Sequence, residues 1–292
     1  MSFDFGSFNE YGTLRKVAIR APSQALQNDL KIDSEWKDLN WHSRPDLESA
    51  MGEYKGFENA LTSTGAEAIH LPSGNGLTLD ALYTRDALVI TPKGIVKPRM
   101  GKPQRRQESD TNAAALVALG FPIAGEITGE GKLEGGDLVW LDRHTLLAGI
   151  GYRTNLEGVQ QLQKLCGNDV EVMWFDMPHH KGVSDVFHLM SVLSPVDQDL
   201  AVVYQPLMPV RLVELLQERG MGFVAVPEHE FDSMGCNVLA IGPRHVLCVE
   251  GNPETVKRMQ AAGVKVEVLA AHDISRKGEG GPTCLTRPLV RA

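Results

Sequence analysis

Residue types that can do chemistry recur at a regular spacing along this chain. Asp86, Asp137, His188, Asn237 and Cys284 follow one another at intervals of roughly fifty residues. A thiolate is a nucleophile, an imidazole transfers protons, and carboxylates bind cations through charge-assisted hydrogen bonds. If the fold brings these positions together, they form one site with a nucleophile, an acid/base group and a cation-binding wall.

The cysteine in this series differs from the other three in its sequence context. Cys166, Cys236 and Cys248 lie far apart and no CxxC motif occurs, so we expect buried thiols and neither a disulfide framework nor a zinc ribbon. Cys284 follows the glycine-rich stretch GEGGPT, which lets the backbone approach a ligand closely. Cys284 and His188 both belong to the series of residues spaced by roughly fifty positions. Together they predict nucleophilic catalysis with proton transfer.

The acidic residues indicate the charge of the substrate. Asp86 ends the motif LYTRD, and Glu134 opens the acidic part of LEGGDL. Acids that flank a thiol would repel an anion and hold a planar cation such as a guanidinium by paired hydrogen bonds. We expect Asp137 to bind backbone amides of the Gly135–Gly136 turn instead. The spacing matches no closed zinc site, so we expect no bound metal.

The elements that must position these residues form a repeat. Strand-turn-strand patterns begin at Asp86, Gly136 and Asn237, and a fourth with a longer turn begins at His188. Each is followed by a segment with helical apolar spacing, such as Leu156 to Leu165, and then by one more short strand. The repeating unit is therefore ββαβ.

The two ends of the chain complement each other. The N-terminal part contributes a lone strand, a helix over Leu47 to Leu61 and a second strand, while one strand follows Cys284. Joined, they complete a fifth unit, and closure removes exposed sheet edges. The sequence predicts one α/β catalytic domain over residues 1–292, a five-bladed pseudo-symmetric propeller closed by pairing of the N- and C-terminal strands.

Two segments do not fit the repeat. The stretch Pro22 to Pro45 is a long connection with two tryptophans, which favours either a lid or a surface loop that covers the rim. The basic run Lys97 to Arg106 is expected to be a solvated face that leads into a helix.

Composition narrows the class of protein. The chain has 292 residues, of which 42% are hydrophobic and 23% charged, which excludes wholesale disorder. A net charge of −8 argues against nucleic acid and anionic membranes as partners. The acidic N-terminus, which lacks an apolar signal segment, favours a cytoplasmic protein. We expect a small-molecule partner and allow for a homodimer.

In their order, the motifs resemble the guanidine-modifying enzymes of the pentein fold. These are the dimethylarginine dimethylaminohydrolases, the arginine deiminases and the amidinotransferases. The resemblance covers nearly the whole chain through LYTRD, LEGGDL, GYRTN at Gly151, HLMS at His188 and GGPTCLTRPLVR at Gly280. It implies cofactor-independent chemistry on arginine or a methylarginine.

The resemblance also implies residue roles. It makes Cys284 the nucleophile and His188 the general acid/base, with Asp86 and Glu134 as the catalytic guanidinium ligands. It further implies that the amino-acid end of the substrate binds through the α-carboxylate ligands Arg99 and Arg153 and the α-amino contact Asp80.

The subfamily depends on a few positions. Deiminases and amidinotransferases carry an acid two residues after the histidine, whereas this chain has Met190 followed by Ser191, as in the dimethylaminohydrolases. Arg85 and the terminal PLVR are deiminase-like instead. We expect a hydrolase that forms a covalent S-alkylthiouronium and releases citrulline and an amine. The alternatives are an amidinotransferase or deiminase, and a non-catalytic binding protein of the same fold.

Overall fold

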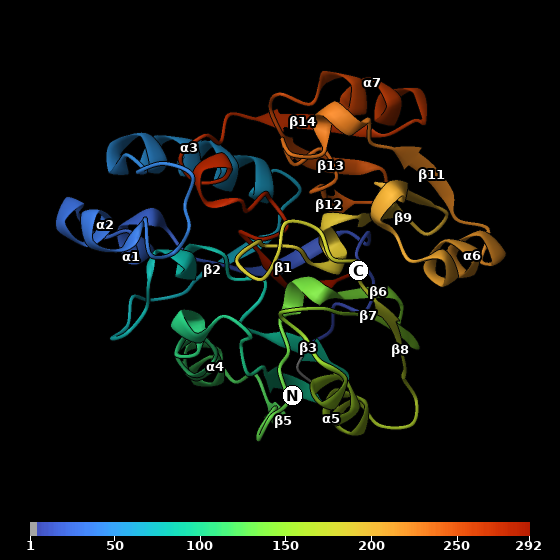
Figure 1. Cartoon of the computed structure of the whole chain (residues 1–292), viewed down its shortest axis with the longest axis horizontal. Coiled ribbons are helices and arrows are strands. Elements are labelled where there is room, and N and C mark those ends of the chain that lie inside the picture. The colour runs from blue at the N-terminus through green and yellow to red at the C-terminus, as the bar shows by residue number, and fades with distance from the viewer. Residues whose placement is uncertain (1–4) are drawn as a thin grey trace.

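Five small sheets organise the molecule. The computed structural model describes residues 5–292, and in that range the strands form five sheets of three strands each. Figure 1 shows these sheets following one another around the middle of the molecule in chain order. The helices lie on the outside of this arrangement.

Four internal units have the predicted order strand, strand, helix, strand. The first contains β3 (Val89–Thr91), β4 (Gly94–Lys97), α4 (Glu108–Ala118) and β5 (Ile123–Glu126). The second contains β6 (Leu138–Asp142), β7 (Thr145–Ile150), α5 (Leu156–Cys166) and β8 (Glu171–Asp176). The third contains β9 (Leu193–Asp197), β10 (Leu200–Val203), α6 (Val210–Glu218) and β11 (Gly222–Ala225). The fourth contains β12 (Leu239–Gly242), β13 (His245–Val249), α7 (Pro253–Ala261) and β14 (Lys265–Leu269).

The fifth unit joins the two ends of the chain, as predicted. It consists of β15 (Arg287–Arg291), β1 (Leu14–Ile19), α3 (Leu47–Thr62) and β2 (Glu67–His70). β1 pairs antiparallel with β15 and parallel with β2, so the terminal strands lie side by side. The ββαβ repeat and the terminal strand pair are therefore confirmed.

All five units share one strand arrangement, which the second unit shows. Its first two strands pair antiparallel, and the helix carries the chain back so that the third strand runs parallel to the second. In α5 the side chain of Asn155 caps the N-terminus by accepting from Gly158 N at 2.9 Å, and Gly167 ends the helix at φ 87. Val159 and Leu162 in the middle of the apolar stripe of α5 are fully buried, whereas Leu156 at its start is 42% exposed.

Hydrogen bonds join the starts of successive units. Asp86 Oδ1 accepts from Gly136 N at 3.0 Å, and Asp137 Oδ1 accepts from Leu189 N at 3.1 Å. Further along, Ser194 Oγ donates to Cys236 O, Asn237 Nδ2 donates to Cys284 Sγ, and Arg85 N donates to Cys284 O. The last of these bonds returns to the first unit. The residues that recur in sequence are thus neighbours in space.

The segment Pro22 to Pro45 is more ordered than a plain loop. It contains α1 (Pro22–Ala25) and α2 (Asp29–Glu35), and Asn28 caps α2 with its side chain. Trp41 is 4% exposed and packs near Tyr83, with ring centroids 5.9 Å apart. One of the two tryptophans is therefore part of the core. In the described range no helix combines the length and apolar character needed to cross a membrane.

Candidate active site

Cys284 lies where two cavities meet. It precedes β15 and lines both a large cavity of about 460 Å³ and a small one of about 20 Å³. A Cβ on Gly281 would collide with the side chain of Asn237, so this glycine allows close packing within the chain, and the approach of a ligand to the glycine-rich stretch stays a prediction. Among the four cysteines, Cys284 is the one that is not fully buried.

The thiol of Cys284 is neutral in the empty site. Burial and the Asp86 carboxylate raise its pKa to about 11, while a hydrogen bond from Asn237 Nδ2, 3.1 Å from Sγ, acts in the opposite direction. A bound cation would oppose the effect of burial. A positively charged ligand beside the thiol would therefore lower its pKa.

His188 is buried against carboxylates. It is 3% exposed, its Nε2 lies 2.8 Å from Glu134 Oε2, and its Nδ1 lies 4.0 Å from Asp86 Oδ1. Burial alone would lower its pKa, but Asp137, Asp86 and Glu134 outweigh that effect and raise the pKa to about 9. The imidazole is therefore protonated at neutral pH and can donate a proton.

Glu134 is fully buried, and both of its carboxylate oxygens accept hydrogen bonds. Its Oε1 accepts from Lys102 N at 3.0 Å, and Oε2 accepts from His188 Nε2 and, at 3.4 Å, from Arg153 Nη1. Burial raises its pKa, but His188 and the nearby guanidinium groups lower it well below the usual range for glutamate. Glu134 thus orients the histidine and remains ionised.

Asp86 belongs to a buried ion-pair network that the sequence interpretation missed. Arg105 Nη1 lies 2.5 Å from Asp86 Oδ2, and Arg105 also pairs with Glu108 at 2.8 Å. All three side chains are buried. The basic run from Lys97 to Arg106 is therefore not simply a solvated face, which corrects that expectation. The acid Glu108, three residues after Arg105, was the available signal.

Asp137 binds a backbone amide, but not one in its own turn. It accepts from Leu189 N at the start of the next unit. The expected bonds within Gly135–Gly136 are thus replaced by a bond between units. Burial raises the pKa of Asp137 to about 6.

The predicted ligands for the amino-acid end of a substrate are separated. Asp80 and Arg153 line the small cavity together with Asp86 and Cys284. Arg99 lines a different hollow beside Arg106, Asp110 and Glu126, and its Nη1 donates to Gly131 O. The structure thus brings Asp80 and Arg153 to the thiol but leaves Arg99 apart from both cavities.

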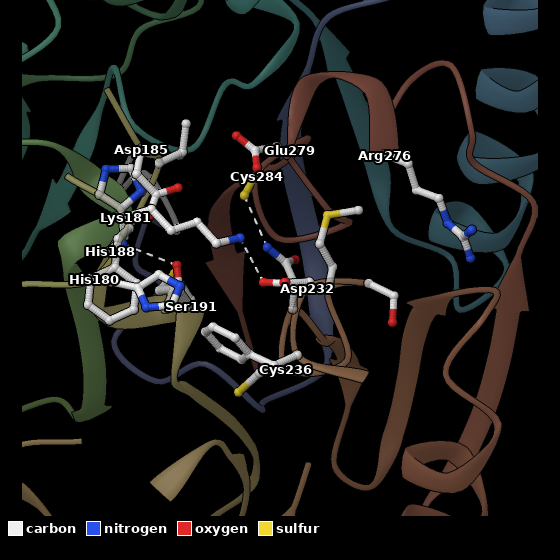
Figure 2. A pocket seen from close by; sticks show the side chains of 18 of the residues that line it. His180, Lys181, Asp185, His188, Ser191, Asp232, Cys236, Arg276, Glu279 and Cys284 are labelled. Carbon is white, nitrogen blue, oxygen red and sulfur yellow. Dashed lines mark hydrogen bonds and ion pairs between the residues drawn. The ribbon is translucent and has the colours of Figure 1, made fainter. Parts of the chain in front are cut away.

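The large cavity has an apolar wall and a charged rim. Met190, Phe187 and Phe231 line it, and His180 packs its ring against both phenylalanines. In Figure 2, Lys181 reaches across to Asp232, an ion pair of 2.8 Å between two partly exposed side chains. His180 lies outside the repeat, so its spacing gave no sign of this position.

Three ligand atoms of Asp86, Glu134 and His188 lie within 4.8 Å of one another, close enough to hold a metal ion. Both carboxylates already have cationic partners in Arg105 and Arg153. The donor set therefore fits a site that holds an organic cation beside existing ion pairs.

Comparison with known proteins gives the family. The family model described as "N,N dimethylarginine dimethylhydrolase, eukaryotic" matches residues 25–291. The chain belongs to this family. Among curated relatives, this dimethylarginine hydrolase family member is 24% identical over 284 residues to the uncharacterized protein YkgA of Bacillus subtilis, covering 97% of this chain and 94% of that one. It is 28% identical to an arginine deiminase of Mycoplasma capricolum, over 56% of this chain and 48% of that enzyme.

Solved structures share the fold of this family member. A cysteine-to-serine mutant of the Pseudomonas aeruginosa dimethylarginine hydrolase, complexed with citrulline, superposes with a TM-score of 0.75 at 19% identity, covering 96% of this chain and 100% of that one. The amidinotransferase SxtG of Microseira wollei gives 0.80 at 14% identity, covering 99% and 97%. The N-terminal domain of a cyanobacterial arginine dihydrolase, ArgZ, gives 0.79 at 18%, covering 94% and 98%. Together the matches support membership of the pentein superfamily, near the dimethylarginine hydrolases.

Proposed function

We propose that this protein is a cysteine-dependent hydrolase that acts at the guanidinium carbon of an N-substituted guanidine. N-methylated arginine is the first substrate to test. The observation that carries the proposal is the position of Cys284, whose thiol joins an open cavity to a wall of buried carboxylates. In this proposal residues 1–292 are one catalytic domain, and its five sheets are the blades of a closed propeller.

The first half of the reaction uses the charges already present. A guanidinium beside Asp86 lowers the pKa of the Cys284 thiol, which loses its proton to solvent. The thiolate adds to the guanidinium carbon, and protonated His188 gives its proton to the nitrogen that leaves. The C–N bond breaks, an amine departs, and an S-alkylthiouronium remains on Cys284.

The second half regenerates the enzyme. Neutral His188 takes a proton from a water molecule, which attacks the same carbon. The C–S bond breaks, the remaining proton of the attacking water passes to the departing sulfur, and a ureido product is released, which is citrulline if the substrate is a methylated arginine. Glu134 keeps the imidazole oriented through both steps, because its 2.8 Å hydrogen bond to Nε2 is buried.

The supporting experiment is a mass-spectrometric screen of the wild-type protein. Arginine, monomethylarginine, asymmetric dimethylarginine and agmatine are incubated separately, and the ureido product and the released amine are both quantified. We expect turnover of at least one methylated guanidine and a transient mass adduct on the peptide that contains Cys284. Product formation only when a second amine is added would identify an amidinotransferase instead. Absence of turnover and of any adduct would overturn the proposal.

A further inference from the structure

Asp80, the residue expected to bind a substrate α-ammonium, already holds an ammonium group from the chain itself. Lys102 Nζ lies 2.6 Å from Asp80 Oδ2 and donates to Leu39 O at 2.8 Å. Trp41 Nε1 donates to the other carboxylate oxygen, Asp80 Oδ1, at 2.9 Å. A carboxylate and a carbonyl oxygen around one Nζ are the partners that a primary ammonium requires.

This ion pair is buried and held from both ends. The side chains of Asp80 and Lys102 are 6% and 11% exposed, and both line the small cavity beside Cys284. The backbone N–H of Lys102 is also fixed, because it donates to Glu134 Oε1. Separating such a pair would leave uncompensated charges in a buried place. A ligand ammonium would therefore compete with a tethered one.

The space beside the thiol is unequally divided. The small cavity of about 20 Å³ has room for about one water molecule, whereas the large cavity measures about 460 Å³. Figure 2 shows Cys284 among the residues that line that large cavity, together with His180, Lys181 and Asp232. An amino-acid head group does not fit at Asp80 while Lys102 stays in place.

We propose that Lys102 occupies the ammonium subsite of this enzyme, so that recognition does not depend on an α-ammonium group. The substrate class then includes N-substituted guanidines whose tails carry no α-ammonium, and these are used at least as well as the corresponding arginine derivatives. Lys102 acts as a specificity-determining residue because it cancels the charge of Asp80. The inference rests on guanidine hydrolysis at Cys284.

The test compares a matched pair of substrates on the wild-type enzyme. One is N-methylarginine, and the other is its analogue without the α-amino group, 5-(N-methylguanidino)pentanoic acid. We expect kcat/KM for the analogue to equal or exceed that for N-methylarginine. A preference of tenfold or more for N-methylarginine in the wild type would overturn the inference, whatever any variant does.

The variant Lys102→Met keeps the backbone N–H and the length of the side chain but removes the ammonium. The substitution frees the Asp80 carboxylate to bind the α-ammonium group of N-methylarginine. The ratio of the two kcat/KM values should therefore shift toward N-methylarginine by about 10- to 100-fold, which is the contribution of one charge-assisted hydrogen bond. Lys97→Met is the matched control, because Lys97 lies on the same segment but pairs with Asp110 and Glu126 outside both cavities. It should leave the ratio unchanged.

Failure of the inference is distinguishable from failure of the proposed function. Calorimetric binding of the same two compounds to Cys284→Ser protein, with Lys102 intact or changed to Met, reports the α-ammonium preference without turnover. Turnover with an unchanged ratio in Lys102→Met would overturn the inference alone. Binding of the analogue without turnover would overturn the proposed function alone, and absence of both binding and turnover would overturn both.

Discussion

The two cavities that meet at Cys284 differ in what fills them. The small cavity is walled by charged groups that are already paired, Asp86 with Arg105 and Asp80 with Lys102. Apolar side chains line part of the large cavity, and its ion pair between Lys181 and Asp232 joins two exposed side chains. Buried pairs hold a fixed geometry, whereas a rim pair of exposed side chains contributes little to stability.

The difference assigns two tasks to the two cavities: the small one orients the reacting groups, and the large one selects among substrates. The small-cavity wall fixes the electric field in which Cys284 and His188 react, because none of its charges can move without loss of a partner. The large cavity supplies the volume in which substituents of different size can be accommodated. Changes to the wall should therefore affect both chemistry and folding, and changes to the large cavity should mainly affect substrate preference.

The largest effect is expected from the thiol at the junction. Cys284→Ser should lower turnover by at least about 1,000-fold, because a hydroxyl has too high a pKa to supply the anion at neutral pH. Steady-state release of amine and ureido product measures this loss. The control is Cys236→Ser, since Cys236 also lines the large cavity but not the small one. Retention of a tenth of the activity in Cys284→Ser would move the nucleophile elsewhere.

The wall of the small cavity is tested next. Asp86→Asn removes one partner from buried Arg105, so we expect a lower kcat/KM together with a loss of about 3 kcal/mol in the free energy of unfolding. Kinetics and urea denaturation measure the two losses. Asp142→Asn breaks an exposed pair with Arg219 and should cost less than about 1 kcal/mol. Equal stability losses in the two variants would contradict the assignment of the wall.

The large cavity should show its effect in selectivity. Met190 is 3% exposed and lines this cavity, so its thioether favours burial of an N-methyl group. Each well-packed methyl should contribute about 1 to 3 kcal/mol to the preference for methylated over free arginine. Met190→Asp should shift kcat/KM toward free arginine, while the similar-sized Met190→Leu should not. A wild-type preference for free arginine would exclude the expected methylarginine selectivity and leave the chemistry intact.

The last effect is on stability alone and concerns the coupling of His188 to the carboxylate wall. Its pKa is raised from 6.5 to about 9 in the folded state, so the folded protein binds more protons than the unfolded chain between these pH values. The free energy of unfolding should therefore fall as the pH rises from 6.5 through 9, by at most about 3 kcal/mol from this group. Urea denaturation across this range measures it. His188→Gln should abolish that part of the slope, and an identical slope in both proteins would refute the coupling.

The repeat and the pairing of its terminal strands followed from the sequence itself. The pattern of strands and helices recurs at nearly equal intervals. A lone strand at each end of the chain completes a fifth unit only if the two strands pair, and β1 and β15 do pair. The same phase identified Asp86, Glu134, His188 and Cys284 as neighbours, because equivalent positions in a repeat lie at equivalent places around its centre.

What the tertiary structure decided is which charges face each other. The basic run from Lys97 to Arg106 has no helical or strand period that indicates where each side chain points, so local sequence could not show Arg105 buried against Asp86 or Lys102 against Asp80. Likewise the position of His180 depends on loops that are distant in sequence, because its ring packs against Phe187 and Phe231. A regular repeat fixes backbone positions, but the pairing of buried charges depends on contacts between segments distant in sequence, and only the folded chain brings those segments together.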